Sequence, residues 1–325
     1  MTAVAQASLA QGRQRKRARN SRAKRETLSF YLFISPWIFG FVFLEVIPLL
    51  VGLASSLTNF SGLFDPKTLK WVGAANYVRA FQDPDAVWGL QRTGVYTAFT
   101  VPMGLLLAFF LAVLLSQKVR ARGFFGVCYY IPGVVPIVGS SWIWRLLMDK
   151  NFGLVNAAVS AIWPGRAINW LSSYPMQVLW VLSLWAGIGG SVVIFLAALQ
   201  SVPRELQEAA LIDGAGSFQE FRYVTAPLVT PVIFYQFVTG IIGSLQTAIA
   251  PILLAGVKVG GIPPRGSYTY MVHVIRQNFS LSRFGYAAAL VWLLFVLILA
   301  LTLVVFRTQR YWVFYEFEQE GGKAK

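Results

Sequence analysis

The stretch EAALIDGAGSFQEFRYVTAPLVTP, residues 208–231, lies between two long apolar segments of a 325-residue chain that is 56% hydrophobic. Together with Glu205 just before it, this stretch brings Glu208, Asp213 and Glu220 into one short loop, although the whole chain has only 13 acidic residues. Charged side chains are rarely buried without a partner. The loop is therefore the first candidate for a surface that meets water or another protein.

The composition is that of a membrane protein. Charged residues make up 13% of the chain, about half of the roughly 25% typical of soluble domains. The net charge of +15 does not favour nucleic-acid binding, because eight of the 28 Lys and Arg residues lie between Arg13 and Arg25 and no folded basic domain follows them. A basic run ahead of an apolar segment is typical of a topogenic tail beside anionic lipid headgroups.

Cysteine and histidine are too scarce for metal or redox chemistry to be expected. Cys128 is the single cysteine and lies in an apolar run, so we expect a small buried hydrophobic residue. His273 is the single histidine, and alone it makes no metal site by spacing. No nucleophile–base pair is evident, so no catalytic residues are expected. The first apolar run is too long for the core of a cleavable signal peptide.

Six segments are long and apolar enough to cross a membrane. A span takes ~20 helical residues, because in hydrocarbon only internal hydrogen bonds satisfy the backbone. We therefore predict an all-α bundle of six transmembrane helices, with both termini on one side. The predicted spans are about Ser29–Leu53, Val95–Leu115, Phe124–Leu147, Gln177–Leu199, Pro227–Leu254 and Tyr286–Phe306.

The placement of Lys and Arg predicts the orientation. The basic tail, the cluster from Lys118 to Arg122 and the end of the chain fall on the same side as the acidic loop. The positive-inside rule makes that side cytoplasmic. We expect a basic cytoplasmic tail over residues 1–27, a permease domain over 28–310 with its cytoplasmic loop at 201–227, and a cytoplasmic tail over 311–325. Trp71, Trp163 and Trp170 in the outer loops fit an interfacial belt.

The acidic loop itself is predicted to form two short helices. Ser201 is a candidate N-cap for the first, and Gly214 and Gly216 are expected to end it. Ser217 and Glu220 have the spacing of a capping box for the second helix. Pro227 would then open the fifth span.

Asp213 stands near the end of the first predicted helix, where an acid opposes the helix dipole at roughly 0.3–1 kcal/mol. It therefore needs a compensating partner, either a local backbone donor or a basic group on another protein. A solvated connector held by ordinary caps explains the helix signals equally well.

The loop resembles the EAA loop of bacterial ABC importer permeases. Glu208-Ala209-Ala210, Gly214 and Pro227 match that pattern, while Val224 and Ala226 replace its usual Ile and Leu. The DGA at residues 213–215 resembles the motif at this place in the carbohydrate branch of these permeases, the maltose and glycerol-phosphate type. Four further stretches resemble the same branch: WVGAANYVRAF (71–81), FGLVN (152–156), FGYAAALVWLLFVLILALT (284–302) and WVFYE (312–316).

The resemblance implies that this loop is a coupling helix seated in a cleft of a cytoplasmic ATPase subunit. It also implies a type I importer permease in the bacterial inner membrane, paired with a second, homologous permease and two ATPase subunits. An extracytoplasmic solute-binding protein would deliver the substrate. The residues expected to couple to the ATPase are Glu208, Ala209, Ala210, Asp213, Gly214, Phe218 and Pro227.

The energy source is expected on another chain. The sequence has no G-x-x-x-x-G-K-[ST] phosphate loop. The chain would therefore hold no cofactor itself, and ATP and Mg²⁺ would bind the partner ATPase subunits.

The fourth and fifth spans flank the loop and carry neutral hydrogen-bonding and aromatic residues, which suit a mono- or oligosaccharide better than an ion. Small and hydroxyl residues also serve helix packing, so each single assignment stays open. The expected substrate path comprises Ser183, Trp185, Gly187, Ser191, Tyr235, Gln236, Ser244, Gln246 and Thr247.

Two alternatives remain open. The same kind of importer can carry another solute, such as a glycerol phosphodiester or a polyamine. An ion-coupled secondary carrier is a different class, and it usually places acids deep in its spans. Here Glu45, in the outer part of the first span, is the single such acid. One acid without a deep partner supports ion coupling poorly.

Overall fold

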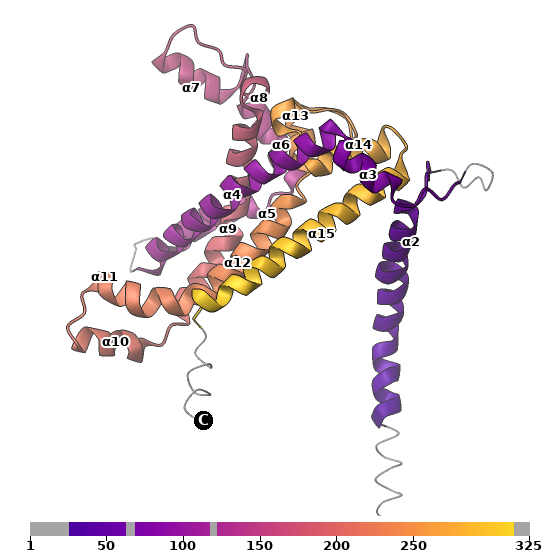
Figure 1. The fold of residues 1–325 in the computed structure, drawn as a ribbon. Coiled ribbons are helices and arrows are strands. Elements are labelled where there is room, and N and C mark those ends of the chain that lie inside the picture. Colours follow the sequence, from indigo (N-terminus) through magenta and orange to yellow (C-terminus); the bar gives the residue numbers. More distant parts are fainter. Residues whose placement is uncertain (1–25, 63–68, 118–121, 315–325) are drawn as a thin grey trace, which may run out of the picture. The chain divides into compact units, whose positions relative to one another are not determined.

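The computed structural model describes residues 26–62, 69–117 and 122–314 (Figure 1). The basic run from Arg13 to Arg25, Lys118, Arg120 and the chain from residue 315 lie outside the described residues, as does part of the WVFYE motif. The chain divides into two compact units, Met1–Ser55 and Ser56–Lys325.

The first unit contains the first predicted span. A helix runs over Glu26–Ser56, includes a π-helical segment η1 (Val42–Val46), and ends in α2 (Ile47–Ser56). Glu45 lies in the π-helical segment, and its side chain is exposed within this unit. The unit is long and apolar enough to cross a membrane once, as predicted.

The second unit is built from helices, and its described part contains one isolated antiparallel bridge, between Thr58 and Trp71. Its α-helices are α3 (Ala75–Gln82), α4 (Pro84–Ser116), α5 (Arg122–Val134), α6 (Ile137–Leu147), α7 (Leu154–Ile162), α8 (Trp170–Ser173), α9 (Pro175–Gln200), α10 (Arg204–Ile212), α11 (Ser217–Glu220), α12 (Ala226–Leu245), α13 (Ile249–Ala255), α14 (Tyr270–Phe279) and α15 (Phe284–Thr308). Shorter segments are η2 (Phe221–Thr225), η3 (Arg265–Ser267) and η4 (Gln309–Tyr311).

The third predicted span is bent rather than straight. Phe124–Leu147 falls on α5 and α6, which meet at an angle of 100°. Pro136, just before α6, has an extended conformation (φ −54°, ψ 139°) that breaks the helix. The described chain therefore has five continuous apolar helices of spanning length, and six spans if the bent pair counts as one.

The fifth predicted span begins and ends earlier than the sequence pattern indicated. A continuous helix runs over Ser217–Leu245, so Pro227 lies inside it and does not open it. The chain breaks after Leu245, and the predicted end of the span belongs to the separate helix α13. The sequence pattern does not show where one helix ends and the next begins, because the apolar run continues through α12 and α13.

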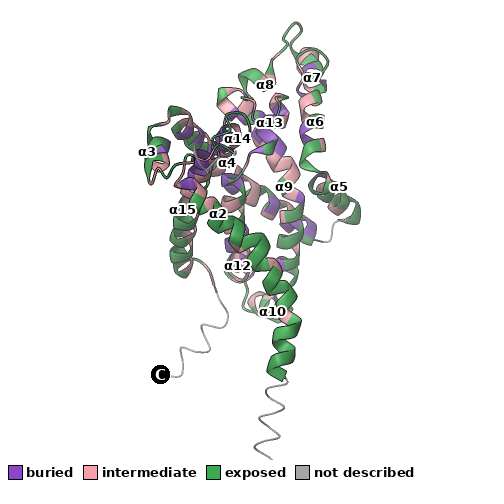
Figure 2. Ribbon diagram, turned by 90° about the vertical axis from the view of Figure 1, so that its right-hand side faces the viewer, coloured by how far each residue is buried: buried purple, intermediate pink, exposed green. Residues whose placement is uncertain are grey.

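Helix α4 is central to the second unit and packs against α9, α12 and α14. Glycines permit the closest approaches: a Cβ at Gly89 would lie 3.1 Å from the Tyr270 Cα, and one at Gly189 would overlap the Tyr129 carbonyl oxygen. Figure 2 shows buried residues on the facing sides of these helices and exposed residues on their outer sides. Cys128 in α5 is exposed, which contradicts its expected burial.

The two ends of this unit carry different structures. Helices α10 and α11 lie at one end, whereas α7, α8 and α13 lie at the other (Figures 1 and 2). The acidic loop is thus set apart from the loops that join the helices at the opposite end. By the positive-inside prediction, the α10–α11 end is the cytoplasmic one.

Candidate functional sites: an acidic loop and a neutral cavity

The acidic loop begins where α9 ends. The hydroxyl of Ser201 donates to the carbonyl oxygen of Ala198 at 2.8 Å, and the Ser201 backbone is helical (φ −82°, ψ −8°). Ser201 therefore completes α9, and the prediction that it caps the next helix is wrong. Pro203 is the actual N-cap of α10 and offers no side-chain hydrogen bond.

Gly214 makes the turn after α10, as predicted. Its φ of +85° is in the left-handed region that favours glycine. The next amide, that of Ala215, donates to the carbonyl oxygen of Ala210 at 3.0 Å and satisfies the helix end. Gly216 instead has φ −73° and ψ 162° and is the N-cap of α11, so the expectation that both glycines end the helix is only half correct.

The second helix is capped one residue away from the prediction. Gln219 Oε1 accepts from the Gly216 amide at 2.9 Å. Glu220, the predicted capping acid, accepts from the hydroxyl of Thr225 instead. The Glu220 carboxylate therefore binds Thr225 in the segment that follows, and it does not cap α11.

The loop exposes apolar side chains that lie outside the membrane-spanning segment α9. Ile212 is 85% exposed and Phe218 74% exposed, and Leu206 and Leu211 are also exposed. Glu208 and Ala209 share this exposure, Ala210 is half-buried, and Asp213 is exposed. An apolar patch rimmed by charges is typical of an interaction surface. Pro227, the remaining predicted coupling residue, is half-buried beyond the π-helical turn.

A cavity of about 280 Å³ lies between α4, α9 and α12. Five of the nine predicted substrate-path residues line it: Ser183, Gly187, Ser191, Gln236 and Ser244. The other lining residues are Tyr96, Thr100, Val101, Gly104, Leu105, Leu184, Ile188, Thr239, Gly240 and Gly243. Among the described residues, no charged side chain lines the cavity.

Hydroxyl and amide groups are organised around this cavity. Tyr96 donates to the Ser183 hydroxyl at 2.8 Å, and Ser244 donates to the Thr97 hydroxyl at 3.0 Å. Gln236 Nε2 reaches the carbonyl oxygen of Ser191 at 3.4 Å. The buried Thr100 hydroxyl has no hydrogen-bond partner among the described residues. Thr100 lines the cavity, so this hydroxyl is an unsatisfied polar group at the cavity wall.

The sequence analysis missed the contribution of α4 to this cavity. Tyr96, Thr100 and Gly104 repeat at helical spacing within an apolar segment, which was the available signal. That segment does not flank the acidic loop in sequence, and the predicted path is confined to the two spans that do.

Four predicted path residues lie outside the cavity lining. Trp185 packs edge-on against Trp144, with ring centroids 5.9 Å apart. Tyr235 is 57% exposed on α12. Gln246 donates to the carbonyl oxygen of Ile242, and Thr247 accepts from Thr269 through its backbone. Their role in a substrate path remains a prediction.

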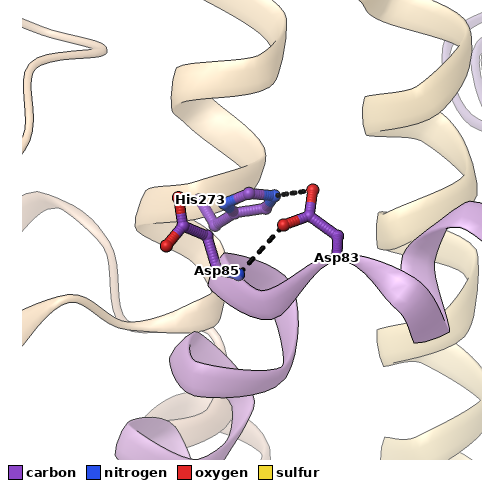
Figure 3. Close-up of side chains that lie close together, drawn as sticks. All are labelled: Asp83, Asp85 and His273. Carbon is purple, nitrogen blue, oxygen red and sulfur yellow. Dashed lines mark hydrogen bonds and ion pairs between the residues drawn. The ribbon is translucent and has the colours of Figure 1, made fainter.

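At the opposite end of this unit, Asp83, Asp85 and His273 come together (Figure 3). Asp83 caps α4 by accepting from the Asp85 amide at 2.9 Å, and its other oxygen accepts from the Tyr286 hydroxyl at 2.9 Å. His273 Nε2 lies 3.4 Å from the same oxygen, and Nδ1 lies 2.9 Å from the Tyr268 hydroxyl. Residues from α4, α14 and α15 are thereby clamped together. We call this group the outer clamp.

The three side chains of the outer clamp offer ligand atoms within 4.8 Å of one another, a spacing that a metal ion requires. Their lone pairs are already engaged, however, and Asp85 forms ion pairs with Arg265 at 3.1 Å and Arg276 at 3.3 Å. Two neighbouring guanidinium groups oppose a further cation. The arrangement therefore suits a structural clamp better than a metal site.

Burial sets the charge states in the outer clamp. Burial lowers the pKa of His273, and it outweighs the opposite effect of Asp83 and Asp85, so the imidazole is neutral at pH 7. For Asp83, burial raises the pKa, but the hydrogen bonds from the Tyr286 hydroxyl and from the two backbone donors outweigh it and lower the pKa. Asp83 is therefore ionised. No sequence pattern predicts this cluster, because His273 lies about 190 residues from the two aspartates.

Comparison with known proteins identifies the family. Residues 100–313 match the model of the binding-protein-dependent transport system inner membrane component. The chain belongs to this family. A relative, the probable ABC transporter permease protein YesP of Bacillus subtilis (strain 168), is 33% identical over 91% of this chain and 95% of its own length. The lactose transport system permease protein LacF of Rhizobium radiobacter is 28% identical over 90% of this chain and 98% of its own.

The fold agrees with this assignment. A crystal structure of a bacterial ABC transporter involved in the import of the acidic polysaccharide alginate superposes with a TM-score of 0.77. It covers 90% of this chain and 98% of the matched one at 20% identity, so it shows the fold alone. The resemblance to ABC importer permeases is confirmed. This binding-protein-dependent permease is a multi-pass inner-membrane transport subunit.

Proposed function

We propose that the chain is the permease subunit of an ATP-driven importer for a neutral mono- or oligosaccharide. The neutral, hydroxyl-lined cavity between α4, α9 and α12 carries this proposal. A sugar offers many hydroxyl groups, and the unpartnered Thr100 hydroxyl together with the Gln236 amide suits them. The relative LacF, named for lactose transport, supports a carbohydrate substrate.

The proposed assembly contains a second, homologous permease, two cytoplasmic ATPase subunits and an extracytoplasmic solute-binding protein. ATP and Mg²⁺ would be bound by the ATPases, because this sequence has no phosphate-binding loop. ATP binding and hydrolysis would shift the equilibrium between outward-open and inward-open arrangements of the spans. Both termini and the acidic loop would lie in the cytoplasm.

Helix α10 is the proposed docking element for the ATPase. Its exposed Glu208 provides a charge for a basic partner group, and the exposed Ile212 and Phe218 provide apolar area. The small side chains of Ala209 and Ala210 let a groove approach the backbone closely. A short helix in a groove is a recurrent form of partner recognition.

The alternatives differ in what they require of the cavity. A glycerol phosphodiester calls for Arg or Lys, and a polyamine calls for Asp or Glu, whereas the described lining is uncharged. An ion-coupled carrier likewise needs an ionisable group in the path. The neutral lining therefore favours a sugar over all three.

Uptake measurements test the proposal. In a strain lacking the chromosomal gene, plasmid-borne permease is expected to restore uptake of at least one sugar in a panel of radiolabelled mono- and disaccharides. Thr100→Val removes the free hydroxyl at almost constant volume and is expected to raise the uptake KM roughly three- to tenfold. Restoration of glycerol phosphodiester or polyamine uptake, with no sugar uptake at all, would replace the sugar by one of those solutes.

A further inference from the structure

A buried hydroxyl joins α10 to the start of the fifth spanning helix. Thr225 Oγ1 donates to Glu220 Oε1 at 2.5 Å, and it accepts from Gln207 Nε2 at 3.3 Å. Thr225 is only 6% exposed, whereas Gln207 and Glu220 are half-buried. Gln207 lies on α10, Glu220 ends α11, and Thr225 ends η2. We call these three residues the loop bridge.

The π-helical turn η2 brings the loop bridge together. In a regular α-helix, residues five apart point about 140° away from each other. Over Phe221–Thr225 the helix takes one extra residue per turn, and the Ala226 amide bonds to the carbonyl oxygen of Phe221. This turn rotates Thr225 back toward Glu220. π-helical turns are uncommon and often occur at functional sites.

Helix α10 has few other connections to the bundle. Among the described elements, its principal packing partners are α11 and η2, the two segments that the loop bridge also joins. Its covalent link to α9 is the short segment Ser201–Pro203. A displacement of α10 therefore reaches the bundle mainly through α11, η2 and the loop bridge.

The helix that receives this displacement continues without a break to the cavity. It runs over Ser217–Leu245. Gln236, Thr239 and Ser244 on this helix line the cavity between α4, α9 and α12. A movement at its loop end can thus pass along one continuous helix, through Pro231, to the lining residues.

We propose that Gln207, Thr225 and Glu220 are positioning residues that transmit the displacement of α10 to the fifth spanning helix and hence to the cavity. This inference rests on the proposed function, in which α10 docks into a cytoplasmic ATPase. Thr225 is buried, and Gln207 and Glu220 are bonded to it, so the loop bridge faces the bundle and not the exposed side of α10 that is proposed to dock. Its loss should leave docking intact and weaken transmission.

Hydrogen–deuterium exchange of the intact transporter tests this role without knowledge of the substrate. The full complex, with both permeases and its ATPases, is compared before and after trapping with ATP and vanadate, and exchange is followed in peptides covering α10 and residues 226–245. In the wild type, trapping is expected to change exchange in both segments. In Thr225→Val and Gln207→Ala, the change in α10 should persist, while that in residues 226–245 should fall roughly fivefold.

Two controls separate transmission from folding. Thr225→Ser keeps the hydroxyl and should restore the response of residues 226–245. Thr302→Val makes the same Thr-to-Val change in α15, outside the loop, and should behave as the wild type. Membrane abundance and recovery of the ATPase are measured for every variant. If the loop bridge were needed only for folding, its variants would reduce membrane abundance and ATPase recovery together. The exchange response of residues 226–245 would then not be lost selectively.

Each remaining outcome is decisive. A full response of residues 226–245 in both Thr225→Val and Gln207→Ala overturns the loop bridge while leaving α10 docking in place. Loss of ATPase recovery in both variants also overturns it, because the bridge is then part of docking or folding. If α10 itself does not respond to trapping in the wild type, the docking assignment fails, and the bridge proposal fails with it.

Discussion

At the scale of single residues, the acidic loop depends on Gly214. Its φ is +85°, and a Cβ built there would meet nothing within 4 Å. The restriction is therefore conformational and not steric crowding: a side chain has room, but an L-residue rarely adopts this backbone. Glu208 shows the complementary case, an exposed acid that the fold of this chain does not need. Gly214 is explained by the turn it makes, whereas Glu208 is explained by the proposed docking of α10 to a partner.

Glu208→Ala is expected to leave the permease folded and to weaken its complex with the ATPase. An exposed helical Glu contributes less than ~0.5 kcal/mol to stability. In a partner's cleft, its removal leaves a buried charge unpaired, which costs roughly 2–5 kcal/mol of binding. Co-purification of the ATPase measures the effect. Glu205→Ala, at another exposed position of α10, is the matched control and should retain the ATPase. Equal recovery in both variants would refute the docking role of Glu208.

Gly214→Val is expected to act more strongly than Glu208→Ala. A β-branched residue at positive φ is strongly disfavoured, at a cost of order 1–3 kcal/mol, so the turn after α10 should distort. Gly216→Val is the control, because Gly216 has φ −73° and room for a Cβ. Sugar uptake and membrane abundance are measured together. If Gly214→Val reduces abundance as much as uptake, the loop is a connector required for folding.

At the scale of elements, close contacts between helices set the shape of the bundle. The bent third span packs its first half, α5, against α9. Gly189 lies against the Tyr129 carbonyl oxygen, and a Cβ at Gly133 would lie 3.3 Å from the Ala186 carbonyl oxygen. In a membrane such small residues permit packing without a hydrophobic driving force. Gly189 therefore serves helix packing, while Gly187, two residues before it, lines the cavity.

Gly189→Ala is expected to destabilise the α5–α9 pair. The added Cβ would overlap the Tyr129 backbone, and overpacking of this kind costs roughly 1–3 kcal/mol. Gly190→Ala, one residue on, meets nothing within 4 Å and should be neutral. Thermal unfolding of detergent-solubilised permease, followed by aggregation, compares the two. A lower midpoint for Gly190→Ala than for Gly189→Ala would contradict this packing.

The outer clamp predicts that the permease is less stable in acid. Both His273 and Asp83 have folded-state pKa values below their usual ones, so the unfolded chain binds more protons and stability rises with pH. The His273 contribution is complete above its unfolded pKa of about 6.5 and is lost as pH falls below it, and the Asp83 contribution follows below about pH 4.

His273→Gln removes the first of these titrations. The variant should have a lower unfolding midpoint at pH 7.5, and its midpoint should change less between pH 7 and pH 5 than that of the wild type. Unfolding midpoints measured across this range for both proteins check the sign. A wild-type midpoint that rises on acidification would show that His273 is protonated in the folded state.

At the scale of the whole molecule, the six predicted spans fix the topology. Reporter fusions after Asn76 and at the C-terminus should report opposite sides of the membrane, with the C-terminus cytoplasmic. Alkaline phosphatase, active outside, and a fluorescent protein, active inside, give complementary readouts. If both fusions report the same side, the bent pair α5–α6 does not cross the membrane as one span.

The sequence alone determined the membrane class, the presence of long apolar helices and the turn at Gly214, because apolar runs of membrane length and a glycine at the end of a helix are local signals. The neutral polar groups of the fourth and fifth spans also predicted nine path residues, of which five line the cavity. Only the tertiary structure decided the 100° bend of the third span, the contribution of Thr100 to the cavity and the outer clamp of Asp83 with His273. It also decided that Glu220 binds Thr225 and not a helix cap. These features depend on which helices lie together and on a π-helical turn, and spacing along one helix does not encode either.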